Sequence, residues 1–299
     1  MSSLNANIKK TLIEKIGIDQ FGTLTTNAIY KILGESGGVI FRGCMKDPEA
    51  FSKFVAVHSS RLSLDPARTM VAGAAQLVDA GMEAVGLHCE NGNSPFWPDI
   101  TWFYCAKAPR KGSQTTICDG ETVLERLSES CRYFFENNLL RYNRTVPGPK
   151  WRRLVCYYTP GLDDPALVVF DDLLKIVGND AGTTITYNSG TDGISYSFVV
   201  SAIQQSSFSN RYAFANSILD PSFNYEKPVI DTASGNPIPA DILSEVNSIT
   251  AQATRPIGWQ DHDVAMIDNR RVMHGREAIY DARRLIYNAL SYRLGAADV

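Results

Sequence analysis

The sequence lacks several features that identify common classes of protein. Its six cysteines include no CxxC pair and no zinc-ribbon spacing, and a chain of 299 residues does not need disulfide bridges to hold a core together. We therefore expect the thiols to be reduced. No apolar run approaches the roughly 20 residues that a membrane helix requires. The first residues also contain no apolar core of signal-peptide length. These absences predict a cytoplasmic protein with no membrane partner.

The chain also lacks an excess of charge of one sign. Its 29 Lys and Arg residues oppose 32 Asp and Glu residues, and no basic run resembles the surface of a nucleic-acid-binding protein. We expect no nucleic-acid partner. The sequence leaves the oligomeric state open, and a homo-oligomer is compatible with it.

The composition is that of a chain with a large core, because 44% of its residues are hydrophobic. No internal repeat, low-complexity tract or linker divides it, so we interpret residues 1–299 as a single domain. Residues 160–240 are rich in Gly, Asp, Ser, Thr and Asn. We interpret this segment as an insertion over the scaffold.

The spacing of apolar residues and the positions of turn residues predict both helices and strands. One or two helices are predicted over 6–35, and further helices over 48–60, 121–140, 204–219 and 239–253. Strands are predicted over 38–43, within 83–118, and over 153–159, 183–187, 194–200, 263–269, 271–275 and 283–294.

His88 and Glu90 lie two residues apart at the start of an aromatic, β-favouring segment. In an extended strand they project to the same face, while Cys89 projects away, so we do not assign Cys89 as a nucleophile. Taken alone, an HxE pair is more often hydrogen-bonded than metal-binding. A second histidine, His274, lies in a strand-turn-strand pattern late in the chain. Two histidines and one carboxylate form the facial set that holds Fe(II) with open coordination positions.

These motifs occur in an order that resembles the taurine dioxygenase/clavaminate synthase-like family of Fe(II)/2-oxoglutarate oxygenases. H-x-E is followed by a threonine in KGSQTTICDG, by DN-x4-HGR, and by an arginine ten residues past the histidine. The resemblance implies that His88, Glu90 and His274 are the iron ligands. It also implies a mainly β fold with flanking helices, the distorted double-stranded β-helix or jelly roll. The 160–240 insertion would then lie over the active site.

The same resemblance implies how 2-oxoglutarate is bound. Thr115 would hydrogen-bond a carboxylate of this cosubstrate, and Arg284 would pair with its far end. Arg283 stands beside Arg284, so either arginine could make that pair. Neighbours in a strand face opposite ways, so only one of them is expected to reach the site. We favour Arg284 because it directly precedes the apolar strand residues 285–287. Gly112-Ser113 departs from the double glycine that is usual in the family.

The implied reaction uses Fe(II), 2-oxoglutarate and O2 to hydroxylate a small molecule, with release of succinate and CO2. No catalytic side chain beyond the metal centre is expected. Halogenating members of the family carry a small residue in place of the carboxylate, whereas this chain keeps Glu90. Desaturation and cyclisation use the same cofactors and differ in substrate placement, so they remain alternatives.

The residues around the motifs suggest a substrate that is amino-acid-derived or a natural-product intermediate. We expect it to contact Asn91, Asn93, Phe96, Trp97 and Arg276. Two alternatives from other classes remain, a zinc hydrolase and a non-catalytic binding module on the same barrel. The sequence has no HExxH spacing, which counts against the commonest zinc hydrolases. His58 and His262 have no motif partners and are interpreted as surface or hydrogen-bonded residues.

Overall fold

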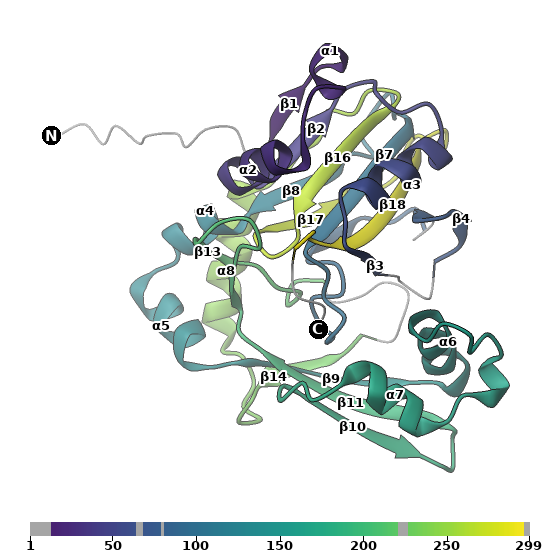
Figure 1. Cartoon of the computed structure of the whole chain (residues 1–299). Coiled ribbons are helices and arrows are strands. Elements are labelled where there is room, and N and C mark those ends of the chain that lie inside the picture. The colour runs from purple at the N-terminus through teal and green to yellow at the C-terminus, as the bar shows by residue number, and fades with distance from the viewer. Residues whose placement is uncertain (1–12, 64–67, 79–80, 221–226, 296–299) are drawn as a thin grey trace, which may run out of the picture.

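The computed structural model describes residues 13–63, 68–78, 81–220 and 227–295, and Figure 1 shows how the elements are arranged. The largest sheet has the strand order β1-β2-β16-β7-β18-β5-β4, and β3 also pairs with β18. Its strands are β1 (Glu14–Ile16), β2 (Gly38–Phe41), β3 (Arg61–Ser63), β4 (Met70–Ala72), β5 (Ala75–Leu77), β7 (Ile100–Lys107), β16 (Asp263–Asp268) and β18 (Leu285–Tyr292). The pair β1 and β2 is parallel, and the other pairs are antiparallel.

A second sheet has the order β15-β8-β17-β6. Its strands are β6 (Val85–His88), β8 (Thr115–Asp119), β15 (Arg255–Pro256) and β17 (Val272–Arg276). The two sheets share a core, in which Phe103 and Ile267 of the large sheet pack with Ile117 and Val272 of the small one. Successive strand residues point to opposite faces, so Trp102 and Tyr104 pack on the other side of the large sheet.

Helices cover the outer faces of both sheets. Helices α2 (Thr26–Ser36) and α3 (Pro48–Val57) pack on the large sheet, and the short α1 (Ile18–Phe21) precedes them. Helices α4 (Gly120–Arg126), α5 (Glu129–Asn137) and α8 (Ala240–Ala253) contribute to a core that includes Cys118 and Met273 of the small sheet. The mainly β architecture with flanking helices is as predicted.

A third layer lies below the two sheets in Figure 1 and contains most of residues 160–240. Its sheet has the order β10-β11-β9-β14. The elements of this layer are β9 (Leu140–Val146), β10 (Thr183–Asn188), β11 (Gly193–Val200), β14 (Val229–Thr232), α6 (Gly148–Tyr158), η1 (Pro165–Leu167) and α7 (Phe170–Val177). Helices α6 and α7 pack on β11 through Trp151, Leu173 and Ile194. The interpretation of 160–240 as an insertion over the active site stays a prediction.

Four predicted elements were wrong. Residues 153–158 belong to helix α6, because Pro149 lies in its first turn and Trp151 and Val155 share a buried face, and Thr159 directly follows the helix. Residues 204–219 contain the strand pair β12 (Ile203–Gln205) and β13 (Tyr212–Phe214) in place of a helix.

The other two errors concern helix boundaries. The helix predicted over 121–140 is two helices, since the Ser128 side chain accepts a hydrogen bond from the Cys131 N–H and starts α5 there. Of the one or two helices predicted over 6–35, the structure has two, α1 and α2, but Glu14–Ile16 is strand β1, and residues 6–12 lie outside the described residues.

Candidate metal centre

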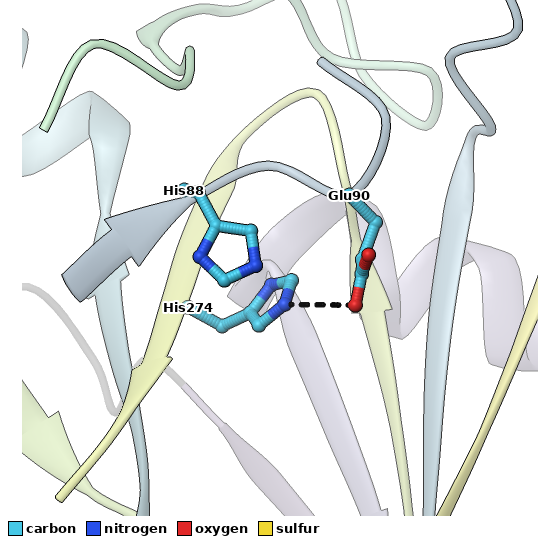
Figure 2. Close-up of side chains that lie close together, drawn as sticks. All are labelled: His88, Glu90 and His274. Carbon is cyan, nitrogen blue, oxygen red and sulfur yellow. Dashed lines mark ion pairs between the residues drawn. The ribbon is translucent and has the colours of Figure 1, made fainter. Parts of the chain in front are cut away.

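Pairing of the strands β6 and β17 places two histidines opposite each other. His88, the last residue of β6, is in register with His274 in the middle of β17. The ring centroids are 4.5 Å apart, with the planes at 56°. The two side chains come from segments that are 186 positions apart in the sequence (274 − 88), and they point toward the same space in Figure 2.

Glu90 completes the group just after β6 ends. Its Oε1 lies 3.5 Å from His274 Nε2. One potential ligand atom from each of His88, Glu90 and His274 lies within 4.8 Å of the others. Within the described part of the chain, these residues form the one group of three or more His, Cys, Asp or Glu side chains that could hold a metal ion.

The environment leaves Glu90 and His274 in the protonation states that a cation requires. Burial by itself raises the pKa of Glu90, but the charge of Arg68 and the contacts with His274 hold that pKa below its usual range. Burial and the neighbouring His88 lower the pKa of His274 to about 4. The site therefore offers a carboxylate and a neutral imidazole at neutral pH. Moreover, the buried Nδ1 of His274 has no hydrogen-bond partner among the described residues.

Residues that the sequence analysis did not identify hold Glu90 in place. Arg68 Nη2 donates to Glu90 Oε1 at 2.8 Å, and Asn288 Nδ2 donates to the same oxygen at 3.3 Å. The Asn269 side chain accepts from the Glu90 N–H and donates to the Glu90 carbonyl, both at 2.9 Å. Asn269 also donates to the carbonyl of Pro98, so one side chain bonds both ends of the loop from Glu90 to Pro98. Asn269 lies in the DN-x4-HGR motif, whereas nothing in the sequence marks Arg68 or Asn288.

Thr115, the first residue of β8, and Arg284, directly before β18, also lie close together. Arg284 Nη2 lies 3.4 Å from Thr115 Oγ1, which also accepts a hydrogen bond from Trp259 Nε1 at 3.1 Å. Burial and the charge of Arg276 lower the pKa of Arg284 to about 10. Its Nε is buried without a partner in the described chain. Such a group favours an anion as its neighbour, because a second charge of opposite sign would offset the cost of burial.

The adjacent arginine points elsewhere. Arg283 pairs with Asp281 at 2.8 Å and is more than half exposed. The structure thus brings Arg284, and not Arg283, to Thr115. Both arginines lie before β18 begins at Leu285 and Arg283 is in a turn, so strand alternation is not the reason for their different directions.

The residues expected to contact a substrate divide into two groups. Asn91, Asn93 and Phe96 line a cavity between their loop and the third sheet. Trp97 is buried and donates from Nε1 to the Asn269 carbonyl at 3.2 Å. Arg276 donates to the backbone carbonyls of Gly81 and Glu83. Trp97 and Arg276 are not among the described residues that line the cavity.

The remaining candidates have structural roles. His58 is buried and lies 2.7 Å from Thr26 Oγ1 through its Nδ1, and His262 Nδ1 lies 3.4 Å from the Tyr104 hydroxyl. Cys89 is buried in the core, where desolvation raises its thiol pKa well above the usual value. All six cysteines are free thiols, as predicted.

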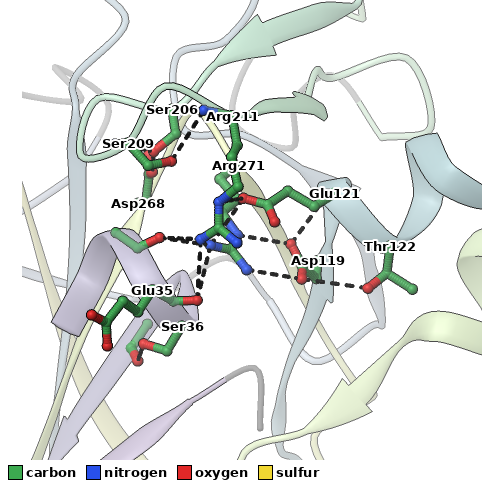
Figure 3. A network of polar contacts seen from close by, with 12 residues as sticks. Glu35, Ser36, Asp119, Glu121, Thr122, Ser206, Ser209, Arg211, Asp268 and Arg271 are labelled. Atoms are coloured by element: carbon green, nitrogen blue, oxygen red, sulfur yellow. Dashed lines mark hydrogen bonds and ion pairs between the residues drawn. The ribbon is translucent and has the colours of Figure 1, made fainter. Parts of the chain in front are cut away.

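A buried ionic cluster supports the strand that carries His274. Arg271, directly before β17, pairs with Asp119 at 2.9 Å and with Glu121 at 3.0 Å (Figure 3). Arg271 also donates to the carbonyl of Gly34 near the end of helix α2. Arg211 pairs with Glu121 at 3.1 Å from the side of the β12–β13 connection. The cluster therefore joins α2, β8, α4 and β17 at one point.

The sequence is similar to a known protein family and to two known proteins. The model of the family described as taurine catabolism dioxygenase TauD, TfdA family, matches residues 6–290. A clavaminate synthase-like protein of Arabidopsis thaliana is 23% identical over 88% of this chain and 85% of its own length. The dapdiamide synthesis protein DdaC of Enterobacter agglomerans is 24% identical over 91% of this chain and 87% of its own length.

A solved structure shares the fold. PvcB from Pseudomonas aeruginosa is described as an Fe, alpha-ketoglutarate dependent oxygenase from an isonitrile synthetic pathway. It superposes with a TM-score of 0.55 and 14% identity, over 91% of this chain and 81% of that chain. This likeness confirms the predicted jelly roll.

In the described part of the chain, no helix is long and apolar enough to cross a membrane.

Proposed function

The chain belongs to the taurine catabolism dioxygenase TauD, TfdA family, and from this premise we propose that His88, Glu90 and His274 hold a single Fe(II) ion. The donor set supports this assignment, since two imidazoles and one carboxylate are the ligands of the facial Fe(II) site. Their spacing within 4.8 Å and the buried His274 Nδ1 without a partner among the described residues are the observations that carry it. The two hydrogen bonds between Asn269 and the Glu90 backbone, and the one that Asn288 donates to the Glu90 carboxylate, would keep Glu90 oriented toward the ion.

We further propose that Thr115 and Arg284 bind 2-oxoglutarate. Arg284 is partly buried, carries a charge, and lies against the Thr115 hydroxyl. A guanidinium binds a carboxylate with two parallel hydrogen bonds and stays protonated, so it suits the far end of a dicarboxylate. Arg276, which is in register with Thr115 on the neighbouring strand, adds positive charge on the same side.

When bound, iron and 2-oxoglutarate supply the oxidation by O2 that leaves succinate, CO2 and a hydroxylated product. The chain itself would bind and orient the cofactors and the substrate, and it would exclude water from them. Glu90 stays ionised beside Arg68, so no proton competes with a cation for its oxygens at neutral pH. The aromatic ring of Phe103, 5.1 Å from the His274 ring, closes the barrel side of the group.

We infer that the substrate is a small molecule of the natural-product or amino-acid-derived kind. Two of the similar proteins support this inference by their descriptions, one in dapdiamide synthesis and one in an isonitrile pathway. Hydroxylation is the outcome we favour, and desaturation or cyclisation would follow from a different placement of the substrate over the same centre. The near-balance of charge supports the expectation that no nucleic acid is bound. A cytoplasmic location and the oligomeric state stay predictions.

The deciding experiment is the anaerobic addition of Fe(II) and 2-oxoglutarate. We expect a weak charge-transfer band in the visible spectrum, followed by succinate formation when O2 and a substrate are admitted. His274→Ala should abolish the band because the ion loses one ligand of three. His262→Ala is the matched control and should keep it, since His262 lies in a turn, contacts the Tyr104 hydroxyl and is not part of this group. Absence of the band in the unmodified protein, or zinc-dependent hydrolysis, would contradict the proposal.

A further inference from the structure

A cavity of about 100 Å³ separates the loop that follows Glu90 from the third sheet. Asn91, Asn93 and Phe96 form one wall, and residues of β9, β10, β11, α6 and α7 form the other. Most of the second wall is apolar and includes Val146, Leu154, Leu173, Ile185 and Ile194. Such a lining favours an aromatic ring or a short alkyl chain over a wholly polar occupant.

The charge in this cavity has one sign. Arg144 on β9 and Lys150 in the first turn of α6 line it, and no Asp or Glu is found among its described lining residues. Arg144 is half-buried, whereas Lys150 is exposed. The cavity is therefore apolar over most of its surface and cationic at one place, which is the pattern that recognises an amphipathic anion.

Tyr196 and Arg144 lie together in the wall of the cavity. The Tyr196 hydroxyl donates to the Asn93 carbonyl at 3.3 Å, which ties β11 to the loop after Glu90. Burial raises the pKa of Tyr196, while the charge of Arg144 and its hydrogen bond to the phenol act in the opposite direction. Arg144 therefore contacts Tyr196 and lies close to the loop. A guanidinium carries five N–H donors, so one bond to a phenol does not use up its capacity for a carboxylate.

We propose that this cavity binds the apolar, carboxylate-bearing end of the substrate, with Arg144 and Lys150 receiving the carboxylate. The inference rests on the proposed function, because Asn91 is bonded directly to Glu90 and an occupant of the cavity lies beside the chain that carries that ligand. The end opposite the carboxylate is then the part presented to the metal. The substrate class that follows is a small carboxylic acid with an aromatic or aliphatic body.

The test uses 3-phenylpropanoate as the probe and its neutral analogue 3-phenylpropanamide as the matched ligand. Binding is measured by calorimetry on the metal-free protein and on the anaerobic protein with Fe(II) and 2-oxoglutarate. We expect the acid to bind at least about 10-fold more tightly than the amide, since hydrogen bonds to charged groups exceed neutral ones. Arg144→Gln should weaken binding of the acid by about 10- to 100-fold and leave binding of the amide unchanged.

Two further variants keep the test decisive. Lys150→Gln changes an exposed side chain, so it should fold normally and weaken binding of the acid by about threefold. Arg153→Gln removes an exposed charge from the same helix outside the cavity and should change nothing. Equal binding of acid and amide, no binding of either, or wild-type affinity in both Arg144→Gln and Lys150→Gln would overturn the proposal. If the acid binds as expected but the charge-transfer band is absent, the proposed function fails and the cavity assignment stands.

Discussion

At the scale of single residues, Asn269 shows how the backbone around a proposed metal ligand, Glu90, is held by a side chain that does not belong to the proposed ligand set. It bonds both the N–H and the carbonyl of Glu90 and also the carbonyl of Pro98. We expect Asn269→Ala to weaken Co(II) binding about 10- to 100-fold, the range found when supporting contacts of metal ligands are lost. The measurement is an anaerobic titration followed by the visible spectrum of Co(II).

The matched control is Asn247→Ala. Asn247 is exposed on helix α8, and its side chain donates to the carbonyl of Leu243 on the same helix. Wild-type Co(II) affinity in Asn269→Ala would mean that the loop is positioned by other contacts.

The buried Asp268, next to Asn269, should make the free energy of unfolding depend on pH. Burial raises its pKa to about 6 from 3.8, so the folded state binds this proton more tightly than the unfolded state does. The contribution of Asp268 to the free energy of unfolding therefore increases as the pH falls through about 6 toward 4, by up to about 3 kcal/mol. We expect the stability difference between the wild type and Asp268→Asn to change by this amount between pH 7 and pH 4, as measured in urea titrations. A difference that does not vary with pH would contradict the assignment.

The sequence identified the candidate ligands but not the residues that hold them. His88, Glu90 and His274 were found by their spacing and by resemblance to a family, and the strand geometry brings them together. Arg68 and Asn288 bond the Glu90 carboxylate from positions 22 and 198 residues away. Such contacts depend on which strands become neighbours, and a single sequence does not state this.

At the scale of elements, the ionic cluster around Arg271 joins four segments. Arg271, Asp119 and Glu121 are all buried. Arg271→Met would leave two carboxylates without their main cation, and loss of one partner of a buried pair costs about 3–5 kcal/mol. Chemical denaturation should show this loss. The control is Arg283→Met, which removes an exposed ion pair and should cost no more than about 1 kcal/mol. Similar losses in the two variants would mean that the cluster does not stabilise the fold.

Elements were predicted well where the sequence pattern has one solution. The strand at Gly38–Phe41 is a short apolar run between glycines, and α8 begins after a proline and has apolar residues on one face. The strand predicted over 153–159 was wrong because aromatic and β-branched residues also suit the buried face of a helix. The single helix predicted over 121–140 was wrong because helical periodicity continues across Ser128, although the Ser128 hydroxyl caps a new helix. When a local pattern fits two secondary structures, packing against the rest of the fold decides between them, and the local pattern does not show that packing.

At the scale of the whole molecule, binding of cofactors to the folded state alone should raise its stability. At 100 times the dissociation constant, a ligand contributes about 2.7 kcal/mol. For a chain of this size that corresponds to an increase in Tm of roughly 5 °C. We expect this shift when Co(II) and 2-oxoglutarate are added together, measured by thermal unfolding under anaerobic conditions. His274→Ala should show no shift, and an equal shift in that variant would place the metal elsewhere.

The order of strands in the two sheets has a consequence for synthesis on the ribosome. The last strands of the chain, β16, β17 and β18, are inner strands with neighbours on both sides, β17 lying between β8 and β6 and β18 between β7 and β5. A nascent polypeptide that has not yet released these segments from the exit tunnel has two incomplete sheets and only the first two members of the ligand group. The proposed iron site is therefore complete only after β17, which carries His274, has paired with β6 and β8.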